Sequence, residues 1–377
     1  MTARVLWLTK GLGLGGAERL LTLAAARIDP TRFEVEVAYL LPWKDAFVPE
    51  LERAGMRTLC IGGPRGADPR WTLRLRRLLR DGNYAIVHTH SPVPAAAARL
   101  LARSPTRLIH TEHNVWDRYR RPTYAANALT YPRNDAVIAV SEGVADSIRR
   151  PRWVPGRYPP VETLLHGVEP DAAPRGSEAR AAARNELGID GSVPLVGTVA
   201  NFTPKKDHAG LFQALDLVRR RIPEAVLILV GSGPLEDQLR ADASARGLAE
   251  SVRFLGSRDD VPSLLPALDV FVLGSRFEGL PISLLEAMAA EVACVSTRVG
   301  GIPEAITDGV EGRLVPAGDP AALADAINEV LLDRDARTSL AAAGRARVEA
   351  EFSIQRAVRR TQEIYAATLG DQLPQQG

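Results

Sequence analysis

Two acidic residues bracket the start of an apolar segment in the second half of the chain. Glu278 and Glu286 have seven residues between them, and Pro281 is one of these. Because proline has a fixed φ and no N–H group, it suits the first position of a helix, and we expect a helix to begin at Pro281. The N–H groups of residues 282–284 would then lack partners inside the helix and would lie at the positive end of its dipole. Such a cluster of donors is a natural seat for a phosphate.

The two carboxylates favour a ligand that carries sugars as well as phosphate. An ionised carboxylate can accept hydrogen bonds from two neighbouring hydroxyl groups at once, whereas a phosphate does not need a carboxylate beside it. The segment therefore predicts a site for a nucleotide sugar, in which a diphosphate lies between two sugar rings. The alternative is a solvated helix start, at which the two acids only interact favourably with the helix dipole.

This segment, residues 275–288, resembles the donor-site signature of the retaining glycosyltransferases of family four. The resemblance continues through residues 294–297 (Cys-Val-Ser-Thr) and 300–304 (Gly-Gly-Ile-Pro-Glu), and it begins near the N-terminus at residues 15–18 (Gly-Gly-Ala-Glu). The matches extend to about residue 360 and so cover nearly the whole chain. They imply the glycosyltransferase B fold, an α/β architecture of two Rossmann-like parallel-sheet domains that face each other across a cleft. Ligands are then expected at the carboxyl ends of both sets of strands.

The resemblance also implies roles for the residues that match. Glu286 is expected to hold the ribose diol, and Glu278 the hydroxyl groups of the transferred sugar. The backbone between them is expected to contact the diphosphate, through Gly279, Leu280, Pro281, Ile282 and Ser283. We expect retaining, hexosyl-type transfer from a UDP- or GDP-linked sugar, with no cofactor. A metal ion is not expected, because the helix dipole and a lysine can stabilise the departing diphosphate.

A basic loop follows the first strand that we expect in the second half, and it runs from Asn201 to Lys206. The family commonly has an arginine at the first of these positions and a lysine five residues later, both on the diphosphate. Lys206 matches the lysine, and we assign it a catalytic role in stabilising the leaving group. Asn201 lacks the charge of the arginine, and Lys205 is our candidate for its replacement. The alternative is a solvated loop.

A glycine-rich loop lies near the N-terminus, at residues 11–16 (Gly-Leu-Gly-Leu-Gly-Gly). It follows an apolar run and precedes a helical segment, so it satisfies the dinucleotide-binding fingerprint literally. Glu34 and Glu36 lie near the position of an acid that would hold the ribose of NAD, but they precede the end of their strand. In the family, Gly15 and Gly16 let the backbone approach the donor diphosphate, because glycine has no side chain to prevent it. An NAD site and a plain tight turn are the alternatives.

Four of the six histidines fall in two short segments of the first half. His88 and His90 are two apart on a predicted strand and so point the same way. With His110 and His113 they could suggest a metal site, but no acidic or cysteine partner completes a ligand set at the usual spacing, so we expect none. Residues 111–114 (Thr-Glu-His-Asn) resemble the family position whose histidine meets the reacting sugar or the acceptor hydroxyl. His113 is therefore a candidate catalytic residue, and a structural histidine is the alternative.

The composition is that of an ordinary globular protein, with 46% hydrophobic and 24% charged residues. A length of 377 residues suggests two domains. No apolar run approaches the roughly 18–20 residues that span a bilayer, and no signal-peptide layout is present. The two cysteines, Cys60 and Cys294, are too few for a disulfide framework. We expect both thiols to lie in the core, and the protein to reside in the reducing cytoplasm.

Charge is unevenly distributed along the chain. Residues 1–168 carry 25 Lys+Arg and 15 Asp+Glu, although the net charge of the whole chain is only +2. A basic half suits an anionic partner, so a membrane surface is a candidate partner and a peripheral position on the inner face of the membrane a candidate location. Trp116 and the arginines at positions 118, 120 and 121 could meet a lipid-linked or anionic acceptor. The alternative is that these arginines are only solvated. We expect no nucleic-acid partner.

Short β-branched runs alternate with longer helical segments, which predicts parallel sheets covered by helices. We expect an N-terminal acceptor-side domain at residues 1–168, a nucleotide-sugar domain at residues 169–352, and a last helix at residues 353–370 that packs back on the first domain. Predicted strands lie at residues 4–9, 33–40, 85–88, 108–111, 136–140 and 163–168, and then at 195–199, 226–230, 252–255, 270–273 and 293–297. The basic amphipathic segment 73–80 lies between strands, so we expect a crossover helix rather than a membrane anchor.

These observations predict a retaining glycosyltransferase that moves a sugar from a nucleotide-sugar donor to a glycan or lipid-linked acceptor, in cell-surface polysaccharide or glycolipid synthesis. A nucleotide-sugar epimerase of the same fold is the first alternative, and it would need no acceptor. An NAD-linked oxidoreductase is the second.

Overall fold

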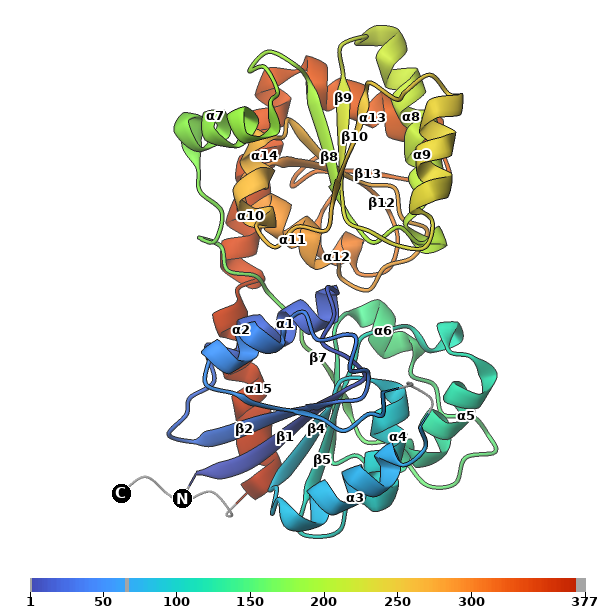
Figure 1. The fold of residues 1–377 in the computed structure, drawn as a ribbon, viewed down its shortest axis with the longest axis vertical. Coiled ribbons are helices and arrows are strands. Elements are labelled where there is room, and N and C mark those ends of the chain that lie inside the picture. Colours follow the sequence, from blue (N-terminus) through green and yellow to red (C-terminus); the bar gives the residue numbers. More distant parts are fainter. Residues whose placement is uncertain (1, 65–67, 371–377) are drawn as a thin grey trace. The chain divides into compact units, whose positions relative to one another are not determined.

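The computed structural model describes residues 2–64 and 68–370. The chain divides into two compact units, residues 1–166 with 354–377 and residues 167–353 (Figure 1). Each unit is built on one parallel β-sheet with helices on its faces. The α/β fold of two parallel-sheet domains that the sequence predicted is therefore confirmed.

The first unit contains a seven-stranded sheet with the strand order β3-β2-β1-β4-β5-β6-β7. All neighbouring strands in it run parallel. The strands are β1 (Ala3–Thr9), β2 (Phe33–Tyr39), β3 (Arg57–Cys60), β4 (Ile86–Thr89), β5 (Arg107–Glu112), β6 (Ala136–Ala139) and β7 (Val161–Thr163). The helices are α1 (Gly16–Ala25), α2 (Val48–Arg53), α3 (Trp71–Asp81), α4 (Pro92–Leu101), α5 (Arg121–Thr130), α6 (Glu142–Ser147) and α15 (Ile354–Leu369), with 3-10 turns η1 (Trp116–Arg118) and η2 (Tyr131–Arg133).

The central strand β1 is buried on both faces because its neighbours and the helices cover both. Val5 and Trp7 belong to one apolar cluster, and Leu6 and Leu8 to the other. The last helix, α15, contributes to the first cluster, and its Tyr365 hydroxyl accepts a 2.9 Å hydrogen bond from Nε1 of Trp7. The final helix is therefore part of the first unit, more than 150 residues after the preceding strand of that unit.

The basic helix α3 is a crossover helix, as the sequence predicted. It connects β3 with β4, and it places Leu75 in the core while Leu78 and Leu79 pack against the same cluster. Its arginines lie on the remaining surface, where an amphipathic helix over a sheet keeps its polar side. No helix among residues 2–64 and 68–370 has the length and apolar character to cross a membrane.

The second unit contains a six-stranded sheet with the strand order β10-β9-β8-β11-β12-β13. The strands are β8 (Leu195–Val199), β9 (Val226–Val230), β10 (Val252–Gly256), β11 (Val270–Leu273), β12 (Ala293–Thr297) and β13 (Arg313–Val315). The helices are α7 (Gly176–Leu187), α8 (His208–Arg221), α9 (Glu236–Ala245), α10 (Val261–Leu264), α11 (Ile282–Ala289), α12 (Ile302–Ala305), α13 (Pro320–Leu332) and α14 (Arg334–Glu351), with 3-10 turns η3 (Pro204–Lys206) and η4 (Leu265–Ala267). Strands of this β-branched composition are typical of a parallel sheet covered on both faces.

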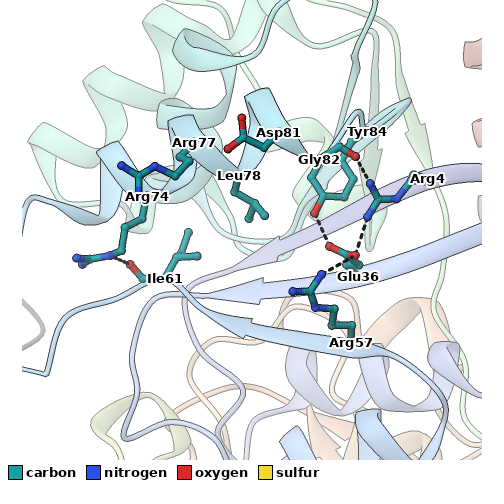
Figure 2. A pocket seen from close by; sticks show the side chains of 10 residues that line it. All are labelled: Arg4, Glu36, Arg57, Ile61, Arg74, Arg77, Leu78, Asp81, Gly82 and Tyr84. Carbon is teal, nitrogen blue, oxygen red and sulfur yellow. Dashed lines mark hydrogen bonds and ion pairs between the residues drawn. The ribbon is translucent and has the colours of Figure 1, made fainter.

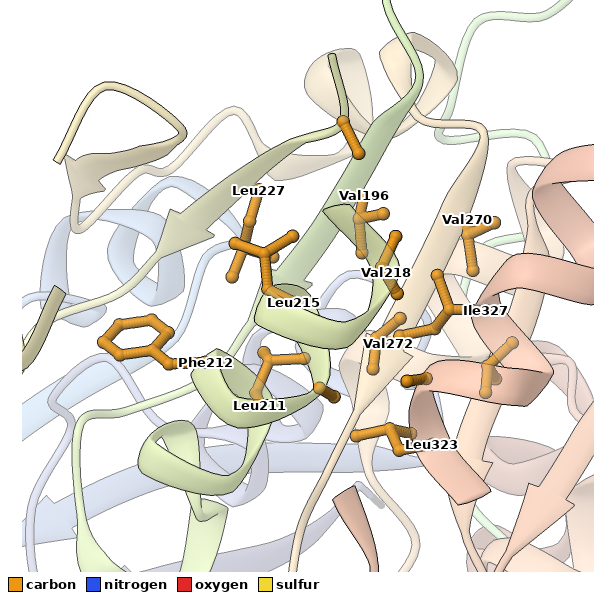
Figure 3. Packing of buried hydrophobic residues seen from close by; sticks show 14 of the residues in the cluster. Val196, Leu211, Phe212, Leu215, Val218, Leu227, Val270, Val272, Leu323 and Ile327 are labelled. Atoms are coloured by element: carbon orange, nitrogen blue, oxygen red, sulfur yellow. The ribbon is translucent and has the colours of Figure 1, made fainter. Parts of the chain in front are cut away.

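The core of the second unit forms where α8 and α13 pack on the sheet (Figure 3). Leu211, Leu215 and Val218 of α8 meet Leu323 and Ile327 of α13 over the central strands. Figure 3 shows these side chains interleaved between the two helices and the strands. Beneath this core β8, β11 and β12 pair in parallel, which places the loops at their carboxyl ends side by side.

Two expectations from the sequence about the first unit were wrong. The strand predicted at residues 163–168 is instead Val161–Thr163, because the backbone pairs with β6 there and leaves the sheet afterwards. Cys60 is exposed rather than in the core, because it ends β3, the edge strand of its sheet. Cys294 is buried, as expected.

Candidate active site

Helix α11 begins one residue later than the sequence predicted. Pro281 is the N-cap residue, with an extended backbone, and Ile282 is the first helical residue. Consequently the N–H of Leu284 already donates to the carbonyl of Pro281, at 3.2 Å. Among the described residues, the N–H groups of Ile282 and Ser283 have no hydrogen-bond partner, so the predicted cluster of donors contains two groups rather than three.

Glu278 lies three residues before Pro281, the N-cap of this helix, and is held by two donors. Oε1 of Glu278 accepts hydrogen bonds from Nζ of Lys206 and from Oγ of Ser275, both at 2.6 Å. The side chain of Glu278 is 6% exposed and that of Lys206 is 11% exposed. The second carboxylate oxygen, Oε2, makes no hydrogen bond to the described residues, so it keeps its accepting capacity for another group.

The loop that carries Glu278 packs against the end of β12 and the residues that follow this strand. Gly300 has φ of +55°, and a Cβ placed on it would come within 2.0 Å of the carbonyl oxygen of Glu278. The N–H of Gly301 donates to the carbonyl of Gly279 at 2.7 Å, and Oγ1 of Thr297 donates to the carbonyl of Ser275 at 2.6 Å. Only glycine fits position 300, because both its backbone conformation and this close approach exclude a side chain.

The basic loop after β8 is joined to the same segment. The N–H of Arg276 donates to the carbonyl of Lys205 at 2.8 Å, and Nε of Arg276 donates to Oδ2 of Asp207 at the same distance. Asp207 has a left-handed backbone with φ of +48°, which turns the chain from η3 into α8. Asn201 and Lys205 lie on the exposed part of the loop.

The sheet order explains why these three loops meet. Strands β8, β11 and β12 are adjacent and parallel, so the loops that follow them emerge side by side at one edge. The loop after β8 carries Lys206, the loop after β11 carries Glu278, and the loop after β12 carries Gly300. The structure thus brings the predicted lysine, glutamate and helix start together, with Glu286 just over one turn inside α11.

Sequence reasoning missed two residues of this cluster, Ser275 and Arg276. Ser275 orients Glu278 and Arg276 joins the two loops. A signal was present, because Ser275 stands three residues before the glutamate, just after a fully buried strand. Ser275 contacts Glu278 only because the loop turns between these two residues, and the sequence did not specify that turn.

In the first unit, Gly15 is the N-cap of α1 and Gly16 its first residue. A Cβ on Gly15 would come within 2.3 Å of Oε2 of Glu18. Burial raises the pKa of the Glu18 carboxyl, although its own N–H group and the charge of Lys44 oppose the shift. Gly16 is exposed, which leaves the backbone open at the start of this helix.

The histidines that the sequence singled out lie at the carboxyl ends of the adjacent strands β4 and β5. The rings of His88 and His90 are 4.2 Å apart between centroids, and Nδ1 of His90 lies 3.4 Å from Nε2 of His113. Burial and neighbouring imidazoles hold the pKa of all three well below the ordinary value. These rings are therefore neutral near pH 7. Within the described part of the chain, no group of three or more His, Cys, Asp or Glu side chains is placed to hold a metal ion.

The segment after His113 was expected to lie on the surface, but its aromatic residue, Trp116, is buried. Trp116 is 1% exposed, and its Nε1 donates to Oε2 of the buried Glu112 at 2.8 Å. Tyr119 also donates to Glu112. Burial alone would raise the pKa of Glu112, but the neighbouring imidazole of His110 and the hydrogen bonds from Tyr119 and Trp116 outweigh it, and the pKa is lowered. Trp116 is thus part of the core of the first unit, where its indole N–H can be buried because the Glu112 carboxylate accepts its hydrogen bond.

A separate cavity of about 460 Å³ lies in the first unit, between α3 and the first strands (Figure 2). Glu36, 5% exposed, lies within it. It accepts hydrogen bonds from Arg4 at 2.7 Å, from Arg57 at 3.4 Å and from Tyr84. Glu36 is therefore satisfied inside the sheet. It does not stand at the end of β2, where an acid would have to bind the ribose of a dinucleotide.

Comparison with known proteins places the chain in a family. Residues 179–347 match the family described as "Glycosyl transferases group 1", and residues 14–172 match "Glycosyltransferase Family 4". A GDP-mannose-dependent alpha-(1-6)-phosphatidylinositol monomannoside mannosyltransferase of Mycobacterium tuberculosis (strain CDC 1551 / Oshkosh) is 30% identical over 361 residues, 90% of this chain and 91% of that protein. The chain belongs to the group 1 glycosyltransferases. It is a retaining, metal-independent enzyme of the hexosyltransferase type, and its co-substrate is a nucleotide sugar.

Another curated relative and two solved structures are also similar to this chain over most of its length. The lipopolysaccharide core biosynthesis mannosyltransferase LpsB of Rhizobium meliloti (strain 1021) is 28% identical over 289 residues, 74% of this chain and 77% of that protein. Among solved structures, Anabaena Alr3699/HepE in complex with UDP-glucose superimposes with a TM-score of 0.85 at 22% identity, over 97% of this chain and 99% of that one. WaaG, a glycosyltransferase involved in lipopolysaccharide biosynthesis, gives a TM-score of 0.77 at 17% identity, over 96% and 99%. The fold is the glycosyltransferase B fold, as the sequence predicted.

Proposed function

We propose that this glycosyltransferase transfers a hexose from a GDP- or UDP-linked donor to a lipid-linked or glycan acceptor, and that the cluster of Lys206, Glu278 and the start of α11 holds the donor. The carrying observation is that one carboxylate oxygen of Glu278 is fixed by Lys206 and Ser275 while the other has no described partner. A fixed carboxylate with one accepting oxygen suits the hydroxyl groups of a sugar.

The diphosphate would lie on the donors beside that carboxylate. The N–H groups of Ile282 and Ser283 lie at the positive end of α11, and Lys206 adds a full charge beside Glu278. When the bond from the sugar to the diphosphate breaks, negative charge develops on the diphosphate. Each preorganised donor that stabilises this charge is worth about 10²–10³ in rate. Glu286 would then bind the ribose diol of the nucleotide.

The other contacts of the proposed donor site come from the loops around this cluster and from the first unit. Gly279, Leu280 and Pro281 form the backbone between Glu278 and the helix, and Gly15 and Gly16 keep the start of α1 open for the diphosphate. Asn201 and Lys205 are exposed beside Lys206, so Lys205 can supply the charge that Asn201 lacks. His113 is proposed to contact the reacting sugar or the acceptor hydroxyl.

The acceptor class is inferred from the relatives and from charge. The relatives include enzymes named for a phosphatidylinositol mannoside and for the lipopolysaccharide core. The basic character of residues 1–168 supports a peripheral position at an anionic membrane on the cytoplasmic side. We expect the protein to sediment with vesicles that contain anionic lipid and not with purely zwitterionic vesicles. If the protein sediments with neither kind of vesicle, the membrane partner is refuted and the donor site is unaffected.

The donor is tested by thermal shift with GDP-mannose, UDP-glucose, UDP-galactose and UDP-N-acetylglucosamine. A true donor at about 100 times its Kd adds ~2.7 kcal/mol of stability, and the Glu286→Gln variant should lose most of that shift. Incubation of the donor without acceptor should leave the sugar unisomerised, which separates transfer from epimerisation. A shift with NAD and with none of the nucleotide sugars would overturn the proposal.

A further inference from the structure

The carboxyl ends of β4 and β5 bring two imidazoles into direct contact, and one of them belongs to a residue that the proposed function uses. Nδ1 of His90 lies 3.4 Å from Nε2 of His113. In a neutral imidazole one nitrogen carries the proton and the other accepts. The contact therefore has only two forms: either His90 donates to His113, or His113 donates to His90.

The neighbouring ring, His88, shows how the network fixes such a choice. Nε1 of Trp7 can only donate, and it donates to the hydroxyl oxygen of Tyr365. That hydroxyl lies 2.6 Å from Nδ1 of His88, and Nε2 of His88 lies 2.7 Å from Oγ1 of Thr111. The proton of the fully buried Tyr365 hydroxyl finds an acceptor only at Nδ1 of His88. His88 therefore carries its own proton on Nε2 and donates it to Thr111.

The same accounting decides the form of His90. Its other nitrogen, Nε2, is buried and has no hydrogen-bond partner among the described residues. A proton on Nε2 would leave a buried N–H without an acceptor, which is rare in folded proteins. A proton on Nδ1 leaves only a lone pair unsatisfied, which costs less. His90 therefore carries its proton on Nδ1 and donates it to Nε2 of His113.

His113 is then fixed in the less common form. Since its Nε2 accepts from His90, a neutral His113 must carry its proton on Nδ1, a nitrogen with no hydrogen-bond partner among the described residues. Burial, together with the surrounding imidazoles, lowers the pKa of both rings well below the ordinary value, so both are neutral near pH 7. His113 consequently presents an N–H group, rather than a lone pair, to whatever binds there.

We propose that His90 is a positioning residue that fixes the Nδ1–H tautomer of His113, so that His113 acts as a hydrogen-bond donor to a substrate oxygen and not as a proton acceptor. The part concerning substrate rests on the proposed function, in which His113 contacts the reacting sugar or acceptor. The tautomer itself does not depend on that function. No proton is transferred by His113 in this arrangement, which is compatible with another group taking the proton of the acceptor.

The experiment is ¹⁵N NMR of the full chain labelled at its six histidines, without any ligand. The long-range couplings of each ring distinguish Nδ1–H from Nε2–H, and His113 is assigned by the loss of its signals in His113→Gln. We expect Nδ1–H for His113 in the unmodified protein and in His90→Asn, whose amide retains a donor near the position of Nδ1. We expect a change to the commoner Nε2–H form in His90→Phe. Finding Nε2–H in the unmodified protein, or no change in His90→Phe, would overturn the proposal.

A matched control and a kinetic measurement complete the test. Tyr365→Phe removes the hydroxyl group next to His88, so it should alter the signals of His88 and leave the tautomer of His113 unchanged. With a donor and an acceptor that the unmodified enzyme uses, His90→Phe should lower kcat about 10–100-fold with little change in donor KM, and His90→Asn should recover most of the loss. Unchanged turnover in His90→Phe would refute the positioning role even if the tautomer follows His90. An unmodified enzyme that transfers no sugar refutes the proposed function instead, and the NMR result still decides the tautomer.

Discussion

Replacement of Lys206 by methionine separates two roles of its ammonium group, action on the substrate and support of Glu278. The ammonium nitrogen lies 2.6 Å from the carboxylate, and the side chains are 11% and 6% exposed. At an effective dielectric constant of about 20, two unit charges at that separation attract by roughly 6 kcal/mol, and desolvation offsets much of this. Removing one partner of such a pair costs about 3–5 kcal/mol, because the other charge remains buried alone.

A double-mutant cycle distinguishes the two roles. We expect Lys206→Met to lower the free energy of unfolding by about 3–5 kcal/mol. Adding Glu278→Gln should recover most of that loss, because no buried charge remains and glutamine still accepts the hydrogen bond of Ser275. Turnover behaves differently if Lys206 stabilises the leaving group. Lys206→Met should lower kcat by about 10²–10³, and the double variant should not recover it.

Urea unfolding followed by tryptophan fluorescence gives the stabilities, and initial rates at saturating donor give kcat. The control is Arg80→Met, which breaks an ion pair with Asp81 of the same 2.6 Å length on the exposed surface of α3. Its unfolding midpoint and turnover should not change, because exposed pairs contribute little. Recovery of turnover together with stability in the double variant would mean that Lys206 only supports Glu278, and the reasoning about the leaving group would be wrong.

Three further outcomes are expected. Gly300→Ala should lower the free energy of unfolding by about 2–5 kcal/mol and abolish most activity, because the new Cβ meets the Glu278 carbonyl. The control is Gly309→Ala, where φ is +78° and nothing lies within 4 Å of the new Cβ. Urea unfolding should show a loss of only about 1–2 kcal/mol for this control. Burial and the charge of Lys206 lower the pKa of His208 to about 4, so the unfolded chain takes up a proton below 6.5 that the folded chain does not. Stability from this group should therefore fall by up to about 1.4 kcal/mol per unit as the pH drops from 6.5 toward 4, and His208→Phe should reduce this slope; an unchanged slope would contradict the assignment. Transfer should persist in excess chelator, and loss of activity that added Mg²⁺ restores would show that the charge on the diphosphate is met by a metal ion.

Local pattern was sufficient for much of the second unit. Strands β8, β9, β11 and β12 begin and end at the predicted residues, because buried parallel strands are short β-branched runs with clear turn signals at their ends. Pro281 was placed one residue too far into its helix. The fixed φ of proline suits both the N-cap and the first helical position, and the deciding angle, ψ, is not restricted in the same way.

Three errors share a cause, which is that burial is decided by neighbours distant in sequence. Trp116 precedes a segment rich in charged residues and was expected at the surface, yet the buried Glu112 accepts its hydrogen bond. Cys60 lies in an apolar run but at the edge of its sheet, so it is exposed. The strand expected at residues 163–168 ends at Thr163, because its pairing partner β6 ends there.

The sequence by itself determined which chemical groups are available and, through their spacing, the family to which the chain belongs. The pair Glu278 and Glu286 around a helix start needs only local geometry, since residues so close in sequence have few ways to be arranged. The contact of Lys206 with Glu278, 72 positions apart, and that of His90 with His113, 23 positions apart, were decided by tertiary structure alone. Each pair lies in loops that follow adjacent parallel strands, and the order of strands in a sheet results from packing of the whole unit, which no short segment encodes.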